Sequence, residues 1–255
     1  MAYLAEYFDT LEINTSYYGP PRDSTTKKWA ESVAGNPRFR FTAKLFHTFT
    51  HERQPAPNDE KDFKDGMEPL MQSGCLGALL LQFPWSFRNS EESRRYLLTL
   101  RSPFREYPLA VEVRHSSWTE PGILDMLAEL GVGLCNIDQP LFSRCIAPSA
   151  LSTSSVGYIR LHGRNYRQWW TENQDTGDRY NYLYSVDEIE PWVQRTEAVA
   201  KESHDTYVVT NNHFIGKAIV NALEIASILQ GVPVKAPPQI VGHYPGLRNF
   251  VEVQQ

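Results

Sequence analysis

Short apolar segments recur along this chain, and most are followed by a longer segment with helical spacing. The clearest is Leu76–Phe83, LGALLLQF, whose unbroken apolar run is typical of a strand buried on both faces. Leu109–Trp118 begins in the same way, with valines that favour a strand. The pattern predicts seven strands, centred near Leu11, Phe41, Leu79, Val111, Leu134, Ile159 and Val208.

Helices are predicted between most of these strands. Asp59–Ser73 is charged and amphipathic, and Val186–Ser203 and Gly216–Gln230 flank the last strand. Strands that alternate with helices form a parallel sheet with helical crossovers. No GxGxxG sequence follows a strand, so a dinucleotide-binding fold is not indicated. We therefore predict an α/β fold, a single TIM-type barrel domain over residues 1–255, with residues 232–255 as a surface tail.

The predicted barrel is one strand short. A closed barrel of this type has about eight strands, whereas the chain opens with a helix-like segment, Met1–Phe8, that no strand precedes. We expect the barrel to lack its first strand, so that the strands near Leu11 and Val208 present unpaired edges. A start site placed too far downstream would explain this. The alternative is that the Pro-rich tail or another chain fills the gap.

Polar side chains stand near the C-terminal end of every predicted strand. Glu112 and Arg114 are two residues apart, so both point to one face of their strand. Catalytic groups of parallel barrels gather at the C-terminal ends of the strands, so we expect these side chains to meet in one pocket. The alternative is that these charged side chains pair with one another and serve only the packing of the barrel. The other strand-end residues are Glu12, Asn14, Lys44, Gln82, Asn136, Asp138, Arg160, His162 and Asn211.

The residue types at these positions indicate an anion site with acid–base chemistry. Arginine grips carboxylates and phosphates in a bidentate manner, and the cations Lys44, Arg114 and Arg160 form the expected anion clamp. Glu112 or Glu12 is the expected general base and His162 the general acid. The candidate catalytic residues are Glu12, Glu112, Asp138 and His162. The candidate substrate-binding residues are Asn14, Lys44, Gln82, Arg114, Trp118, Arg160, Arg164, Trp169 and Asn211.

An aromatic and basic segment, Asn165–Tyr184, follows the sixth predicted strand and includes Trp169 and Trp170. It should overhang the mouth of the barrel, where Trp169 and the adjoining Arg164 would contact a ligand and exclude water. The alternative is that its aromatic side chains only pack the segment onto the rim. Trp118 lies just past a strand end and is open to the same two interpretations.

Composition and charge argue against several classes of protein. Lys and Arg number 25 against 30 Asp and Glu, and the resulting net charge of −5 disfavours non-specific nucleic-acid binding. Cys75, Cys135 and Cys145 show no CxxC spacing and are expected to be reduced thiols of a cytoplasmic protein. The N-terminus lacks the pattern of a signal peptide, and no apolar run approaches a membrane span. No HExxH sequence occurs, so residue spacing indicates no metal site. The carboxylates near the strand ends would suit a divalent metal as well as acid–base work, and the sequence does not name a cofactor.

Six blocks of sequence, in order along residues 3–230, resemble the DUF72 (YecE-like) family. They are DTLEINTSYYGPP, FRFTAKLFHTFTHER, LGALLLQFPWSF, LAVEVRHSSW, YIRLHGRN with YNYLYS, and VVTNNHFIGKAIVNALEI. The resemblance implies a TIM-type barrel in a cytosolic protein and does not specify a reaction. Family members usually begin with a strand and a GTSGW-like block, and this chain starts after it. The family-matching positions are Glu12, Asn14, Lys44, Gln82, Glu112, Arg114, Trp118, Arg160, His162, Gly163 and Asn211.

Together these observations predict an enzyme that acts on a small anionic substrate, phosphorylated or carboxylated, by acid–base chemistry at the barrel mouth. A nucleic-acid-processing or nucleic-acid-binding barrel is the second hypothesis, with the aromatic segment stacking on bases. A non-catalytic ligand-binding scaffold is the third. The sequence names neither the substrate nor a cofactor, nor the oligomeric state.

Overall fold

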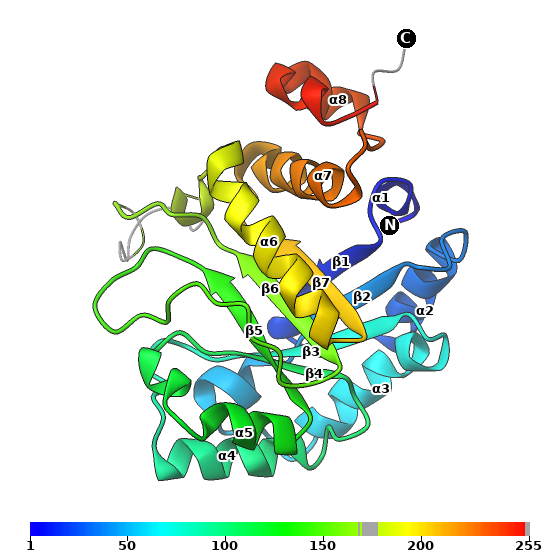
Figure 1. Cartoon of the computed structure of the whole chain (residues 1–255). Coiled ribbons are helices and arrows are strands. Elements are labelled where there is room, and N and C mark those ends of the chain that lie inside the picture. The colour runs from blue at the N-terminus through cyan, green and yellow to red at the C-terminus, as the bar shows by residue number, and fades with distance from the viewer. Residues whose placement is uncertain (168, 170–177, 253–255) are drawn as a thin grey trace.

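The computed structural model of the protein describes residues 1–167, 169 and 178–252, so Trp170 and its neighbours in the aromatic segment lie outside the described residues. Seven parallel strands form one sheet whose order follows the chain from β1 to β7, and helices cover its outer face (Figure 1). The strands are β1 (Thr10–Ile13), β2 (Arg40–Lys44), β3 (Leu76–Gln82), β4 (Leu109–Glu112), β5 (Val132–Asp138), β6 (Val156–Leu161) and β7 (Asp205–Thr210).

Three predicted helices, Asp59–Ser73, Val186–Ser203 and Gly216–Gln230, begin and end within one residue of their predicted bounds. Ser90 caps a further helix by accepting a hydrogen bond from the Ser93 backbone N–H, and Ser185 and Glu188 form a capping box at the helix that begins at Val186. No helix in the described ranges is both long and apolar enough to cross a membrane. The helices are α1 (Ala2–Ala5), α2 (Asp23–Ser32), α3 (Asp59–Gln72), α4 (Glu91–Arg101), α5 (Ile123–Glu129), α6 (Val186–Glu202), α7 (Lys217–Gln230) and α8 (Pro238–His243).

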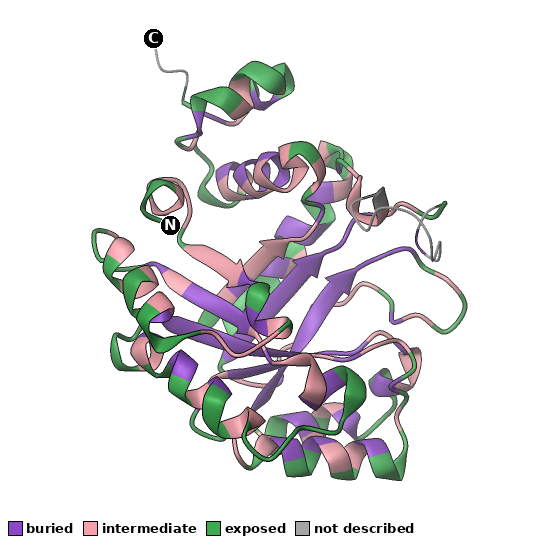
Figure 2. Ribbon diagram, turned by 180° about the vertical axis from the view of Figure 1, so that it is seen from behind, coloured by how far each residue is buried: buried purple, intermediate pink, exposed green. Residues whose placement is uncertain are grey.

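The prediction of a seven-stranded α/β barrel is confirmed. The sheet curls until β1 and β7 come close together, but no ladder of hydrogen bonds joins these two strands within the part of the chain that the structure describes. Burial follows from this topology, since β5 and β6 are buried along their whole length whereas β1 and β7 are mostly half-buried (Figure 2). The barrel is therefore nearly closed, with a seam between its first and last strands.

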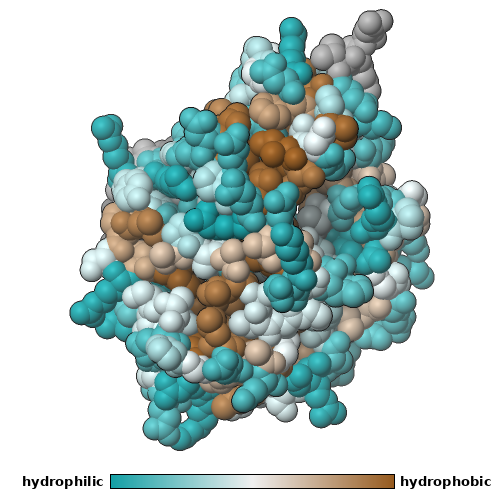
Figure 3. Space-filling view, viewed as in Figure 1, coloured by the Kyte–Doolittle hydropathy of each residue, from teal (hydrophilic) through white to brown (hydrophobic). Residues whose placement is uncertain are grey.

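The segment after Val232, which we expected to be a surface tail, packs against α7. Most of its residues are exposed or half-buried, but Leu247 and Val251 are buried in one apolar cluster with Val220 and Leu223 of α7. Figure 3 shows an apolar surface of α7 below α8. The C-terminal segment therefore covers this surface only in part. The physical reason is the composition of α7, which is apolar on more than its sheet-facing side and is stabilised by burying its outer side as well.

Candidate active site

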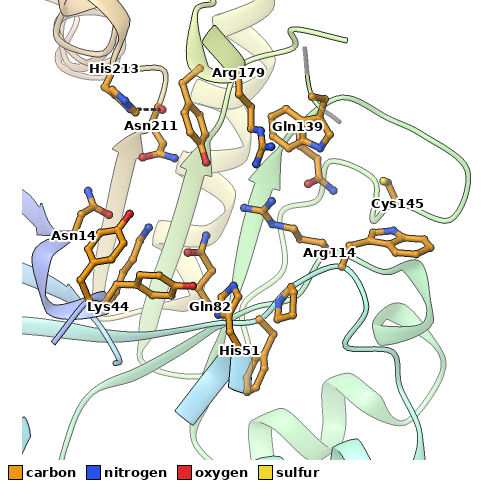
Figure 4. Close-up of a pocket in the computed structure, with 17 residues that line it drawn as sticks. Asn14, Lys44, His51, Gln82, Arg114, Gln139, Cys145, Arg179, Asn211 and His213 are labelled. Carbon is orange, nitrogen blue, oxygen red and sulfur yellow. Dashed lines mark hydrogen bonds between the residues drawn. The ribbon is translucent and has the colours of Figure 1, made fainter. Parts of the chain in front are cut away.

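A cavity of about 700 Å³ opens at the C-terminal ends of the strands. Its walls come from residues at or just after the ends of β1, β2, β3, β4, β5 and β7, and from the aromatic segment (Figure 4). Six predicted substrate-binding residues line it: Asn14, Lys44, Gln82, Arg114, Trp169 and Asn211. The remaining polar and aromatic lining residues are Tyr17, Tyr18, His51, Phe83, Trp85, Gln139, Cys145, Arg179, Tyr180 and His213.

Four other residues that the sequence places near strand ends, Glu12, Glu112, Arg160 and His162, form a deeper layer. The side chains of Glu12, Glu112 and Arg160 are buried, with no more than 2% of any of the three exposed. Arg160 Nη2 lies 2.7 Å from Glu12 Oε1, and Arg160 Nη1 contacts Glu112 Oε2. The Tyr158 hydroxyl donates to Glu12 Oε2 at 2.9 Å. We call these residues and His162 the buried ion network.

Pairing with cations keeps both glutamates of the network ionised. Burial alone would raise the pKa of Glu112, but Arg160, His162 and Arg114 outweigh it and hold the pKa well below its ordinary value. The pKa of Glu12 is likewise lowered, because Arg160 and Lys44 outweigh the effect of burial. A lowered pKa weakens a carboxylate as a proton acceptor near neutral pH, and neither glutamate lines the cavity.

His162 is fully buried at the end of β6 and does not line the cavity. Its Nδ1 lies 3.1 Å from Asn211 Nδ2, and its Nε2 lies 3.3 Å from Glu112 Oε1 without hydrogen-bond geometry. Burial, with the nearby Arg160, lowers the pKa of His162 to about 4 although Glu112 opposes the shift. The imidazole is therefore neutral near pH 7, which argues against the predicted role of general acid.

Arg114 connects the buried ion network to the cavity. Its Nε and Nη2 donate to Glu112 Oε1 at 3.1 and 3.0 Å, and its guanidinium lies 5.9 Å from the centre of the Trp169 ring. Gln82 Nε2 donates to the same Glu112 oxygen at 2.9 Å. One buried carboxylate oxygen thus orients two side chains that line the cavity.

Lys44 stands at the end of β2 and lines the opposite part of the cavity (Figure 4). Its Nζ lies 5.9 Å from the centre of the Tyr17 ring, and no carboxylate of the described residues lies within 4 Å of it. Burial and then Arg160 lower the pKa of Lys44 to about 8, against the opposing effect of Glu12 and Glu112. A substantial fraction of this amine is therefore unprotonated in mildly alkaline solution.

Two lining residues that sequence reasoning missed add to the polar wall. Gln139 is 2% exposed, and its Nε2 has no acceptor within the described residues. His51 lies on a π-helical turn, Thr48–Glu52, next to Tyr17. Partial enclosure in the wall, with repulsion from Arg114 and the neighbouring histidine, lowers the pKa of His51 to about 4. Gln139 directly follows a strand end, so the strand-end rule would have found it, whereas the irregular turn carries no simple sequence signal.

Asp138 and Arg164 pair with each other at the edge of the site and do not line the cavity. Arg164 Nε and Nη2 donate to Asp138 at 2.9 and 3.1 Å, and the Tyr184 hydroxyl donates to the same carboxylate at 2.5 Å. Gly163 adopts a φ of 86°, where an added Cβ would lie 2.7 Å from the Tyr182 Cβ. These contacts tie together the two ends of the aromatic segment, which supports the packing interpretation for Arg164.

Trp118 is held away from the cavity. It is fully buried, its indole N–H donates to the Phe87 carbonyl at 2.7 Å, and its ring stacks on that of Phe87 at 5.1 Å. The expected substrate contact is therefore not seen, because a short helical turn, Ser116–Thr119, directs the indole into the core. No group of three or more His, Cys, Asp or Glu side chains in the described ranges could hold a metal ion.

Comparison with known proteins places this architecture in a family. The family model described as "Protein of unknown function DUF72" matches residues 1–240. A DUF72 family protein from Thermotoga maritima is 31% identical, with 88% of this chain and 85% of that chain covered and a TM-score of 0.77. One from Enterococcus faecalis is 27% identical, with 90% and 87% covered and a TM-score of 0.81. No curated protein is detectably similar to the chain. The resemblance seen in the sequence is thus confirmed, and this barrel protein belongs to the DUF72 family.

Proposed function

We propose that this protein is an enzyme that binds a small carboxylated or phosphorylated substrate in the cavity at the barrel mouth. The observation that carries the proposal is the charge of the wall. Lys44, Arg114 and Arg179 line the cavity, and no Asp or Glu does so among the residues that the structure describes. Cations in a partly enclosed site of this kind attract and hold anions.

The unused hydrogen-bonding capacity of the wall supports the same ligand class. Arg114 donates from Nε and Nη2 to Glu112 and makes no hydrogen bond through Nη1 to any described residue. Gln139 Nε2 is buried and has no acceptor among the residues that the structure describes. Buried donors are almost always paired in folded proteins, so Gln139 Nε2, together with Arg114 Nη1, suits the oxygens of a bound anion.

A group that can lose its proton near neutral pH supports catalysis rather than binding alone. Lys44 lines the cavity and has a pKa of about 8. Perturbed pKa values in a cavity are common at catalytic sites. We therefore place the chemistry on Lys44 in place of the buried glutamates and His162. We also propose that the protein works in the cytoplasm, since Cys75, Cys135 and Cys145 are free thiols.

Matched ligand pairs test the proposal. Lactate and glycerol 3-phosphate should raise the melting temperature in a concentration-dependent way, because a ligand that binds only the folded state stabilises it. Their uncharged counterparts, lactamide and glycerol, should not. Added salt should weaken the effect of the anions. Equal shifts with charged and uncharged members of each pair, or no shift with either anion, would contradict an anion site.

The aromatic lining favours a second candidate, a protein that binds single-stranded nucleic acid. Tyr17, Tyr18, Trp85, Trp169 and Tyr180 all line the cavity, and such rings stack on bases. The net charge of −5 opposes this candidate. Binding of a short oligonucleotide that falls steeply with salt, together with no effect of the small anions, would favour it over the first proposal.

A further inference from the structure

The surroundings of Lys44 distinguish it from a lysine that only supplies charge. Its ammonium group lies in the cavity wall with no carboxylate of the described chain within 4 Å and no hydrogen bond from Nζ to a described residue. Lys64 and Lys61 show the usual arrangement on the surface, where each pairs with an acidic side chain on its own helix. The carboxylates nearest Lys44 belong to the buried ion network and are already paired with arginine.

Burial and then the charge of Arg160 favour the neutral amine of Lys44. The two carboxylates Glu12 and Glu112 face two guanidinium groups, those of Arg114 and Arg160. The ammonium form of Lys44 would therefore add a positive charge that no further carboxylate of the described residues pairs with. A lysine that is desolvated and next to other cations becomes a nucleophile near neutral pH. The charged and titratable groups around it are Glu12 on β1, Glu112 and Arg114 at β4, Arg160 on β6, and Tyr17 and His51 in the cavity wall.

The opposite side of the cavity supplies a place for an anionic group. Figure 4 shows Arg114, Arg179 and Gln139 directed toward one another on one side, and Lys44 and Asn14 together on the other. A ligand with an anionic group at one end would therefore direct its other end toward the amine. Such an arrangement orients the reacting carbon and lowers the entropic cost of the reaction.

We propose that Lys44 is a catalytic nucleophile that forms an imine with the carbonyl group of an anionic substrate, either a 2-oxo acid or a phosphorylated aldehyde or ketone. This inference rests on the anion-binding function proposed above. The nitrogen lone pair attacks the carbonyl carbon, a C–N bond forms, and the carbonyl oxygen takes up a proton as the nitrogen loses one. The remaining N–H proton then passes through solvent to the carbinolamine hydroxyl, the C–O bond breaks, and the oxygen leaves as water while the C=N bond forms. No oxidant or reductant takes part.

Hydride trapping tests the proposal on the intact protein. Pyruvate and dihydroxyacetone phosphate, in separate reactions with sodium cyanoborohydride, should yield a reduced adduct that peptide mass spectrometry locates on Lys44. The two ligands distinguish the carboxylated from the phosphorylated class. Lactate and glycerol 3-phosphate carry the same anionic groups without a carbonyl, and they should give no adduct. The rate of trapping should rise with pH through about 8, as the amine loses its proton.

Variants separate nucleophilic attack from charge. Lys44→Arg keeps a cation and should abolish the adduct while the thermal shift with lactate or glycerol 3-phosphate persists. Lys27, on the exposed face of α2, is the control lysine and should remain unlabelled in the wild type. The wild-type experiment does not depend on how the variant folds. Absence of an adduct at Lys44, or labelling no faster there than at Lys27, would overturn the inference. This holds whatever thermal shift lactate or glycerol 3-phosphate gives. The proposed function fails instead if the anions give no thermal shift, or shift the melting temperature no more than their uncharged counterparts do.

Discussion

Arg114 donates from both Nε and Nη2 to a single oxygen of Glu112, at 3.1 and 3.0 Å. The carboxylate is buried, whereas 17% of the arginine side chain is exposed toward the cavity. The pair therefore holds the guanidinium in a fixed orientation without using Nη1. A preorganised cation of this kind binds an anion at little further entropic cost.

Arg114→Ala should weaken the binding of lactate or glycerol 3-phosphate by about 1.5–3 kcal/mol, the scale of a hydrogen bond to a charged group. Stability should fall less, because Glu112 keeps its contact with Arg160. Titration calorimetry measures the first effect and urea unfolding the second. Arg88→Ala is the matched control. Arg88 is exposed and packs on the Trp85 ring, but Arg88 itself does not line the cavity. Equal effects of the two substitutions would remove Arg114 from the site.

Arg160→Met should destabilise the fold by about 3–5 kcal/mol, because it leaves Glu12 and Glu112 buried without their shared partner. Adding Glu12→Gln to this variant should recover part of the loss, since the number of uncompensated charges falls. The free energy of unfolding in urea gives both values. If Arg160→Met costs less than about 1 kcal/mol, the network contributes little and the two glutamates must find other compensation.

Gln139→Leu should lower anion affinity by about 1 kcal/mol while leaving stability unchanged or slightly increased. The unusual combination arises because Gln139 Nε2 is a buried donor without an acceptor in the described ranges, so an apolar side chain removes the cost of burying it in the free protein. Gln139→Glu has nearly the same shape and places a negative charge beside Arg114 and Arg179, so it should abolish binding. Retention of full affinity in both variants would show that no anion contacts this position.

His162 should make the protein less stable as the solution becomes acidic. The folded-state pKa of about 4 is below the ordinary value of 6.5, so the unfolded chain binds a proton first as the pH falls. The contribution of His162 is complete above pH 6.5 and is lost as the pH falls toward about 4, at up to about 1.4 kcal/mol per pH unit.

His162→Gln should flatten this part of the curve of unfolding free energy against pH. His204, whose side chain is 84% exposed, supplies the control, and His204→Gln should leave the slope unchanged. A His162→Gln variant with the wild-type slope would show that the imidazole is not held neutral in the folded protein.

The strands and their inward face could be predicted from sequence because both depend on local patterns. Apolar runs marked all seven strands, and the two-residue spacing correctly put Glu112 and Arg114 on one side, where they form a hydrogen-bonded pair. The same rule brought Lys44, Gln82 and Asn211 to one cavity. Periodicity of two is a property of the backbone itself, so it survives folding.

Depth along the barrel could not be predicted in this way. Two residues of a strand span about 6.6 Å, so Glu12 and Asn14 share a face but lie in different layers. Asn14 lines the cavity, whereas Glu12 pairs inside the barrel. Which member of each pair reaches the cavity depends on the stagger between strands and on what covers them, such as the Trp169 ring near His162. Both are tertiary properties.

The seam between β1 and β7 gives the cavity one compliant side. A ring of strands resists widening because each strand pair would have to give up backbone hydrogen bonds, but no such ladder joins β1 to β7 in the described residues. Widening there would break no such ladder among the described residues. Asn14 follows β1 and Asn211 follows β7, so these two lining residues face each other across the split. The mouth of the barrel can thus widen at the seam to admit ligands of different width, while the paired strands keep their hydrogen bonds.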